Sequence, residues 1–387
     1  MDLSSPATLD GRALPAAASI DLAEGKEAES IWASFADAAL LTPYQSSGWL
    51  AGVEAAFGKS GEPLRLLLIR IGGHILAALP FTITRHWGIT LAEIPGSSLG
   101  NSDWMPQLPG ATLDKPLLSR AFATLSGSHG VDVLRFANLP PDWQGTANPL
   151  LAFDAAPSPD HFYVGSIDPG TLDNLPKRRR VDIQRGRRRL EELVGPVSLR
   201  RARTEAEVEE FHAAFLAQRD TRFRQMGVTN IFAEPAFVAL FDDLGKASLG
   251  EPRPVMRVDA LLGGDEVLAT AIGIQTRSHY SQYINSNTSG PAAKYSLMGL
   301  LMYLLVEDLT AEGIRSLDLG VGDFGYKEVW TQKTEVFDLV LPLTAKGRLV
   351  APAFRAKRSS KRLIKQNEHL WQFAKRLRLL KQSLHTS

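Results

Sequence analysis

PVMRVDALL-GGD-EVLATAIGIQ, at residues 254–275, repeats the pattern of an earlier stretch, LRLLLIRI-GGH-ILAALPFTI, at residues 64–83. Each stretch holds two apolar runs joined by a Gly-Gly pair. Glycine accepts the left-handed backbone of a tight turn, so both stretches predict a β-hairpin.

The segments that follow the two hairpins also share one order: a helical stretch, a glycine stop and a strand. These parts are residues 117–125, Gly130 and residues 132–137 in the first copy, and residues 296–312, Gly313 and residues 315–320 in the second. The spacings within the two copies differ by no more than the length of a loop. The sequence therefore predicts two copies of one α/β unit.

Composition narrows the class of protein. The chain has 387 residues, 44% hydrophobic and 22% charged, which suits two globular domains. It has no cysteine, which excludes disulfides, thiolate metal sites and a cysteine nucleophile. Its eight histidines have no metal-ligand spacing, so we predict no metal. No apolar run approaches the roughly 20 residues of a membrane span, and the acidic N-terminus does not resemble a signal peptide, so we expect a cytoplasmic protein.

Charge is unevenly distributed along the chain. Residues 354–387 carry ten Lys or Arg and one acid, a net charge of +9 that leaves −8 elsewhere. Apolar residues recur between these cations at close to helical spacing, at Leu363, Leu370, Trp371, Ala374, Leu377 and Leu380. The pattern predicts a basic amphipathic helix. Three partners stay open: the acidic body of the chain, an anionic membrane bound through residues 354–382, and nucleic acid.

Two short motifs lack the context that their chemistry needs. Residues 96–100, GSSLG, match a nucleophile elbow, but turn formers follow where a helix is required. Residues 320–325, GVGDFG, match a dinucleotide-binding loop, yet about ten residues before the next strand at residue 336 are too few for a helical crossover. We therefore expect neither a serine hydrolase nor a nicotinamide enzyme. The glycines still indicate a sharp turn or close approach of a ligand.

Other motifs carry a family resemblance. In the second copy they are YSLMGLL at residues 295–301, DLG at 318–320 and GDFGYKEVW at 322–330; upstream lie a basic block at 177–190, TPYQSSGW at 42–49 and NSDW at 101–104. This series resembles the GNAT-superfamily acyltransferases of the CelD-like (cellulose biosynthesis) or FemAB-like branch. The resemblance implies an α/β (α+β) fold of tandem GNAT-like lobes, each with a mixed, mainly antiparallel central sheet flanked by helices.

Five segments follow from this reading. We expect a flexible acidic tail at residues 1–30, an N-terminal lobe at 31–165, a basic interlobe helix at 166–195, a catalytic lobe at 196–345 and a basic C-terminal helix at 346–387.

The resemblance also implies acyl transfer to an amine, from acetyl-CoA or another acyl-CoA. GNAT enzymes generally hold the donor pyrophosphate in a Gly-rich loop, but here the corresponding stretch reads TSGPAAKYS at residues 288–296. A helix N-terminus can still bind phosphate there. We expect donor contacts from Lys294, Tyr295, Ser296 and Gly299.

Candidate catalytic residues gather at the end of the second-copy strand: Lys327, Asp318, Tyr326 and Asp323. Lysine stabilises developing negative charge and tyrosine relays a proton. Candidates for substrate binding are Tyr283, Gly322, Trp330, Arg180 and Arg185. Structural alternatives stay open: Asp318 as an acceptor for backbone N–H groups, Tyr326 and Trp330 as a packed pair, and the basic block as a solvated surface.

Three functions therefore compete. The first is N-acyl transfer to a small-molecule or lipid-linked amine in polysaccharide or cell-envelope biosynthesis, by a cytoplasmic protein at the periphery of the inner membrane. The second is a FemAB-like transfer from aminoacyl-tRNA, which the basic segments favour. The third is a non-catalytic accessory module of a polysaccharide-synthesis complex, which the altered phosphate loop favours.

Overall fold

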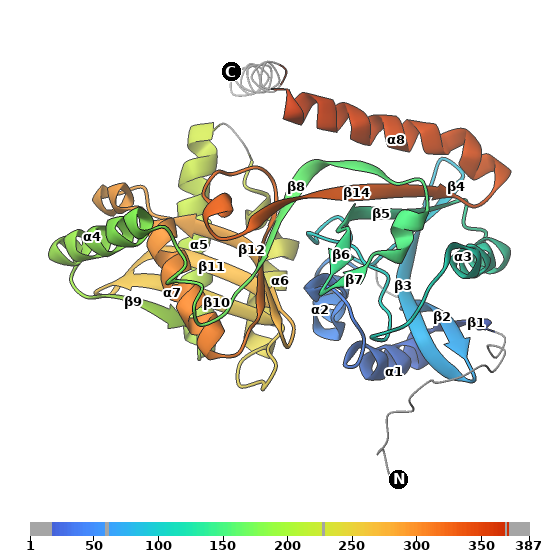
Figure 1. The fold of residues 1–387 in the computed structure, drawn as a ribbon, viewed down its shortest axis with the longest axis horizontal. Helices are drawn as coiled ribbons and strands as arrows, with labels where there is room; N and C mark the ends of the chain where they lie inside the picture. Colours follow the sequence, from blue (N-terminus) through green and yellow to red (C-terminus); the bar gives the residue numbers. More distant parts are fainter. Residues whose placement is uncertain (1–17, 59–61, 227–228, 368–369, 371–387) are drawn as a thin grey trace, which may run out of the picture.

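The computed structural model describes residues 18–58, 62–226, 229–367 and 370, and among them twelve strands form one continuous sheet (Figure 1). The strands follow in spatial order: β1 (Ser19–Glu24), β2 (Arg65–Ile71), β3 (His74–His86), β4 (Ile89–Glu93), β5 (Val133–Leu139), β14 (Gln332–Pro342), β8 (Ala156–Ser166), β13 (Ser316–Val321), β12 (His279–Asn287), β11 (Glu266–Gln275), β10 (Met256–Gly263) and β9 (Val197–Arg201). A small ribbon of β6 (Asp142–Trp143) and β7 (Thr146–Ala147) lies apart from it.

The sheet is built from two copies of one unit, as the sequence predicts. The first contains β1 to β5 with helices α1 (Gly25–Ala36), α2 (Ser47–Phe57) and α3 (Lys115–His129); the second contains β9 to β13 with α5 (Glu205–Met226), α6 (Pro235–Ala247) and α7 (Leu297–Ala311). In each copy one pair of strands is parallel, β4 with β5 and β12 with β13, and the other pairs are antiparallel. The predicted fold, a mixed and mainly antiparallel sheet flanked by helices, is confirmed.

Two long strands are exchanged between the lobes. β8 follows the first lobe in sequence but pairs with β13 of the second, whereas β14 follows β13 and pairs with β5 of the first. β8 and β14 also pair with each other, so they join the lobes at the centre of the sheet (Figure 1). The expected lobe boundary at residue 165 therefore falls inside a strand that hydrogen-bonds to the second lobe.

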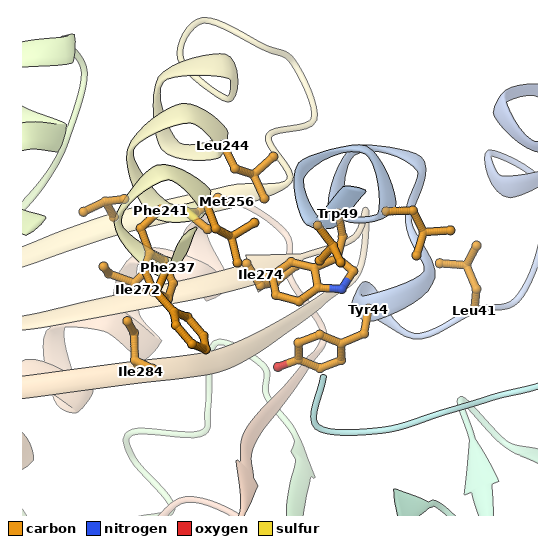
Figure 2. Close-up of a cluster of buried hydrophobic side chains, with 14 of the residues drawn as sticks. Leu41, Tyr44, Trp49, Phe237, Phe241, Leu244, Met256, Ile272, Ile274 and Ile284 are labelled. Carbon is orange, nitrogen blue, oxygen red and sulfur yellow. The ribbon is translucent and has the colours of Figure 1, made fainter. Parts of the chain in front are cut away.

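A shared hydrophobic core fills the space between α2 and α6. Trp49 is completely buried there, with Tyr44 and Phe241 around it (Figure 2). A Cβ atom at Gly48 would lie 2.5 Å from a methyl group of Val255, so glycine lets α2 approach the second lobe closely. Because the core draws on both lobes, it fixes their relative position.

The remaining elements are short helices and two long basic helices. The short ones are η1 (Pro43–Gln45), η2 (Pro149–Ala152), η3 (Ile231–Ala233), η4 (Pro291–Tyr295) and η5 (Lys327–Val329). α4 (Lys177–Val194) covers the second lobe through Ile183 and Leu190, and α8 (Ala345–Gln366) lies along β8 and β14. No helix in the described ranges is long and apolar enough to cross a membrane.

The N-terminal tail is shorter than expected. β1 already pairs with β2 from Ser19 onward, and α1 begins at Gly25. The prediction of a flexible tail to residue 30 is therefore wrong for residues 19–30, because β1 forms one edge of the twelve-stranded sheet and α1 buries Ala28. Residues 1–17 lie outside the described part of the chain.

The C-terminal helix is docked, at least over α8. Arg358 binds Asp338, Arg362 binds Glu335, and Lys365 binds Asp160. These pairs support the acidic body of the chain as the partner of this part of the helix. Of the apolar residues named for the tail, Trp371, Ala374, Leu377 and Leu380 lie outside the described residues.

Candidate active site

A pocket of about 270 Å³ opens where β12 and β13 stop pairing. The parallel ladder joins the strands only as far as Ser281 and Asp318. Beyond that point both strands line the pocket, together with residues from α5, α7, η5 and the first lobe. The pocket therefore lies at the carboxyl ends of two parallel strands, where α/β proteins commonly bind ligands.

Asp318 lies beneath this pocket and organises its floor. The carboxylate is fully buried; it accepts hydrogen bonds from Ser281 Oγ at 2.7 Å and from the backbone N–H of Gly320 at 2.8 Å. His279 Nε2 lies 2.7 Å from its second oxygen. Gly320 has a φ of 67°, which favours glycine. Asp318 does not line the pocket, so the structure places it as a group that holds the turn.

Lys327 projects back under the same turn. Its side chain is 3% exposed, and Nζ donates to the carbonyl oxygens of Val321 at 3.0 Å and Gly320 at 3.4 Å. Burial lowers the pKa of Lys327 to about 8, against the attraction of Asp318. At pH 7 the Lys327 side chain is therefore still mostly charged. Lys327 also lines the pocket, so a positive charge stands at its wall.

The first lobe contributes directly to this site. Asn101 lines the pocket, and a Cβ atom at Gly320 would lie 2.7 Å from its amide nitrogen. Asn101 Nδ2 donates to the Tyr44 hydroxyl, which lies 2.6 Å from Ser281 Oγ. Because Ser281 donates to Asp318, one hydrogen-bond chain runs from the first lobe to the buried carboxylate.

Tyr326 and Tyr283 also line the pocket. Tyr326 OH accepts a hydrogen bond from Asn285 Nδ2 at 3.2 Å. Burial raises the pKa of Tyr326, so its phenol stays protonated and able to donate. Tyr283 packs on Tyr44 and Trp49, which gives it a structural role in addition to its place in the wall.

Asp323 lies outside the pocket, on the side of the loop that faces β8. Burial alone would raise the pKa of its carboxyl, but hydrogen bonds from Tyr163 and His161 bring it below its ordinary value. Tyr163 OH donates to it at 2.9 Å, and Lys333 Nζ lies 3.4 Å away. These contacts are those of a residue that anchors the loop.

The other predicted substrate residues do not line the pocket. Trp330 is buried in the hydrophobic cluster of the second lobe. Gly322 donates its N–H to His161 O at 3.0 Å and has a φ of 102°. Arg180 pairs with Asp173, and Arg185 is exposed on α4.

The four predicted donor residues lie together where α7 begins. Ser296 precedes α7 with a φ of 55°, and its hydroxyl makes no capping hydrogen bond. Lys294 is exposed and lies over the ring of Tyr295. A Cβ atom at Gly186 would lie 3.3 Å from Tyr295 O, so α4 passes close to this end of α7. Gly299 forms the first turn, where an added Cβ would lie 2.9 Å from Ser296 Oγ.

Five polar side chains of the pocket wall were not predicted from sequence: Asn101, Arg219, Arg222, Gln282 and Asn285. Asn101 belongs to the NSDW motif, so the resemblance pointed to its segment without a role. Arg219 and Arg222, three positions apart on α5, share a helix face; that spacing was the available signal. Among the described residues, no group of three or more His, Asp or Glu side chains is placed to hold a metal ion.

Known proteins are similar to this chain in part of its sequence and in its fold. Residues 177–328 match the family described as acetyltransferase (GNAT) domain. No curated protein sequence matches the chain.

Several solved structures are similar in fold. FemX is 11% identical with a TM-score of 0.57, over 85% of this chain and 100% of that one. A conserved protein of unknown function from Bacteroides thetaiotaomicron is 9% identical with a TM-score of 0.53, over 81% and 96%. L-PGS from Bacillus licheniformis is 10% identical with a TM-score of 0.48, over 88% and 97%. Because the sequence identities are so low, the likeness to FemX and to the Bacteroides thetaiotaomicron protein shows a shared fold alone. The chain is an acyltransferase, and its residues 177–328 match the acetyltransferase (GNAT) domain.

Proposed function

We propose that this acyltransferase moves an acyl group from acyl-CoA to an amine, with the pocket between β12 and β13 as its active site. The observation that carries the proposal is Lys327, a buried ammonium group in the wall of a pocket inside the GNAT domain. A positive charge near the carbonyl oxygen favours acyl transfer, because attack by the amine leaves a negative charge on that oxygen.

The step proceeds by direct attack. The amine nitrogen forms a bond to the acyl carbon, the tetrahedral intermediate collapses, and the carbon–sulfur bond of the thioester breaks. The amine loses a proton and the departing thiolate gains one. We assign Lys327 to stabilise the oxyanion and Tyr326 to relay a proton, since both line the pocket. Asp318 and Asp323 are assigned to position the loop that carries them.

The donor is assigned to the start of α7. Free N–H groups at a helix N-terminus favour phosphate, and Lys294 adds a positive charge beside them. The exposed basic residues of α4, including Arg185, lie on the helix that passes this end of α7. The CelD-like or FemAB-like branch and a role in polysaccharide or cell-envelope biosynthesis are part of this proposal.

The experiment that tests it measures release of free CoA. The chain has no cysteine, so a thiol reagent such as DTNB detects CoA without background from the protein. Acetyl-CoA and longer acyl-CoAs are each offered with a panel of amines, including amino sugars and amino acids. Amine-dependent thiol release that disappears in Lys327→Ala supports the proposal. Release that is unchanged in that variant contradicts the assignment of the site.

Transfer from an aminoacyl-tRNA is the second candidate, favoured by the exposed basic face of α4 and by the shared fold with FemX. Thermal unfolding with acetyl-CoA or with charged tRNA separates the two, because a ligand stabilises the folded state that binds it. Stabilisation by charged tRNA alone would favour this candidate. Stabilisation by neither donor would favour an accessory module.

We also propose that the basic C-terminal segment, residues 354–382, brings the enzyme to an anionic membrane and so to a lipid-linked amine. Docked α8 still exposes Lys357, Lys361, Leu363 and Ile364. Near an anionic surface each cation contributes about 1 kcal/mol. Sedimentation with anionic and neutral liposomes at low and high salt tests the contact. An absence of salt-sensitive binding would leave only the docked helix.

A further inference from the structure

We propose that the pocket between α5, β12 and β13 binds a substrate with a carboxylate or phosphate group, held by Arg219 and Arg222, and that Gln282 hydrogen-bonds a polar group beside that anion. The proposal relies on the proposed acyl transfer for the use of the pocket as an active site. The anion itself follows from the lining of the pocket alone.

The charge of the lining points to an anion. Among the described residues that line the pocket, Arg219, Arg222 and Lys327 are cationic and none is an aspartate or glutamate. Asp318 lies nearby, but its oxygens are already taken, Oδ1 by Ser281 and Gly320 and Oδ2 by His279. A pocket with three cations and no acid attracts negatively charged ligands.

Among the residues that the structure describes, Arg219 and Arg222 also lack the acidic partners that another arginine of the same lobe has. Arg257 in the same lobe is enclosed by Asp259, Asp308 and Glu312. Within the described part of the chain, neither Arg219 nor Arg222 has a salt bridge, and Arg219 Nε is buried without a hydrogen-bond partner. Burial lowers the pKa of Arg219 to about 10, and the neighbouring Arg222 adds to the effect. An anion between the two guanidinium groups would relieve this repulsion and satisfy the free N–H groups.

Gln282 supplies a second, independent observation. It is 3% exposed and lines the same pocket, yet neither its amide nitrogen nor its amide oxygen has a partner in the described structure. Buried polar atoms in folded proteins are nearly always hydrogen-bonded. A side chain that offers one donor and one acceptor group to a pocket is suited to a hydroxyl, amide or amine of a ligand.

The anion has two possible sources: the phosphates of the donor or an acidic group on the amine acceptor. The first experiment measures binding of inorganic pyrophosphate by titration calorimetry. The double variant Arg219→Gln, Arg222→Gln is compared with Arg224→Gln, a matched control on the same helix whose exposed side chain pairs with Asp220 at 3.0 Å. We expect the double variant to weaken pyrophosphate binding at least tenfold and the control to leave it unchanged.

Kinetics then identify the source. For the donor, acetyl-CoA is compared with S-acetylpantetheine, which lacks phosphate. For the acceptor, glucosamine 6-phosphate is compared with glucosamine, and glycine is compared with glycinamide. If the anion belongs to the donor, the double variant should have a tenfold higher KM for acetyl-CoA only. An acceptor source predicts a tenfold higher KM for the acidic amine and an unchanged KM for its neutral partner.

Gln282→Leu tests the remaining contact. Removing unpartnered buried atoms should raise the melting temperature of the ligand-free protein, while the KM of the anionic substrate rises. An unchanged KM would remove Gln282 from the proposal.

Equal pyrophosphate affinity in the double variant and the control, with equal KM values, would overturn the anion site even if acyl transfer is found. Arginine-dependent pyrophosphate binding without acyl transfer to any amine would support the anion site and refute the proposed function.

Discussion

The two lobes use the same pair of parallel strands in different ways. In both, the parallel ladder ends at its third residue pair, Glu93 with Arg135 in the first lobe and Ser281 with Asp318 in the second. In the first lobe this pair is a salt bridge, with Arg135 Nε donating to Glu93 at 2.7 Å. In the second lobe the buried Asp318 carboxylate accepts a hydrogen bond from the N–H of Gly320 in the turn that follows.

The residues that follow this pair, in β5 of the first lobe and β13 of the second, also have different surroundings. In the first lobe Asp103 binds β5: the carboxylate accepts from Ala137 N at 2.7 Å, and Asp103 N donates to Ala137 O at 3.1 Å. In the second lobe Leu319, Gly320 and Val321 face the pocket instead. The segment that carries Asp103 also sends Asn101 into the pocket of the second lobe. At this strand end the first lobe pairs its charged groups with each other and with the backbone, whereas the second lobe leaves cations and an amide for a ligand.

Charge removal in the two lobes provides the sharpest test of this comparison. Lys327→Ala and Asp318→Asn should each lower turnover about 10²-fold or more, because one removes a stabilising charge and the other the turn that places it. Arg135→Gln, the matched change in the first lobe, should leave turnover within about twofold. Steady-state kinetics measure the rates, and circular dichroism checks the fold. Normal turnover in both second-lobe variants would remove this site.

The pH profile sharpens the role of Lys327. Because its pKa is lowered to about 8, we expect turnover to decline as pH rises through 8 and the ammonium loses its proton. Lys327→Arg should move this decline to higher pH, since arginine keeps its charge. Asp318→Asn should move it to lower pH, because the attraction of Asp318 raises the pKa of Lys327. A decline at the same pH in all three proteins would assign it to another group.

In the first lobe we expect the buried acid Asp103 to affect the unfolding free energy rather than turnover. Burial raises the pKa of Asp103 to about 7, although Ser97 and Ala137 donate hydrogen bonds to it. A carboxyl with a raised folded pKa binds more protons when folded, so its contribution is complete below about pH 4 and is lost as pH rises through 7. Asp103→Asn does not titrate. The unfolding free energy of the natural chain, measured in urea relative to this variant, should fall between pH 4 and 7. A constant difference would show that Asp103 titrates normally.

The smallest expected effect is that of the salt bridge in the first lobe. Both side chains of the Glu93–Arg135 pair are half-buried. Arg135→Gln should lower the unfolding free energy by about 1 kcal/mol, typical of a partly exposed pair. Urea denaturation with Glu93→Gln and the double variant measures the coupling. Additive effects of the single variants would show that the pair contributes nothing as a pair.

The repeat and its elements could be predicted from sequence because they are local. The Gly-Gly turn at residues 72–73, the helix before Gly313 and the strand around Asp318 appear where the pattern places them. The second turn lies one residue later than predicted, at Gly264 and Asp265, because Gly263 still pairs with Glu266 in the ladder. Lys327, Tyr326 and Tyr283 do line one pocket. The exchange of β8 and β14 was not predicted, because either strand fits the edge of either lobe and only the long-range pairing selects one.

Apolar residues, basic segments and the neighbourhood of each turn follow from the chain alone, since each is a property of neighbouring residues. Tertiary structure decided which polar groups are satisfied. Asp318 and Asp103 are both buried acids, yet Asp318 positions a turn under a pocket and Asp103 binds the backbone of β5 at Ala137. Arg219 and Arg257 are both arginines of the second lobe, yet only Arg257 is surrounded by acids in the described structure. The difference depends on partners far away in sequence, so only the folded chain brings it about.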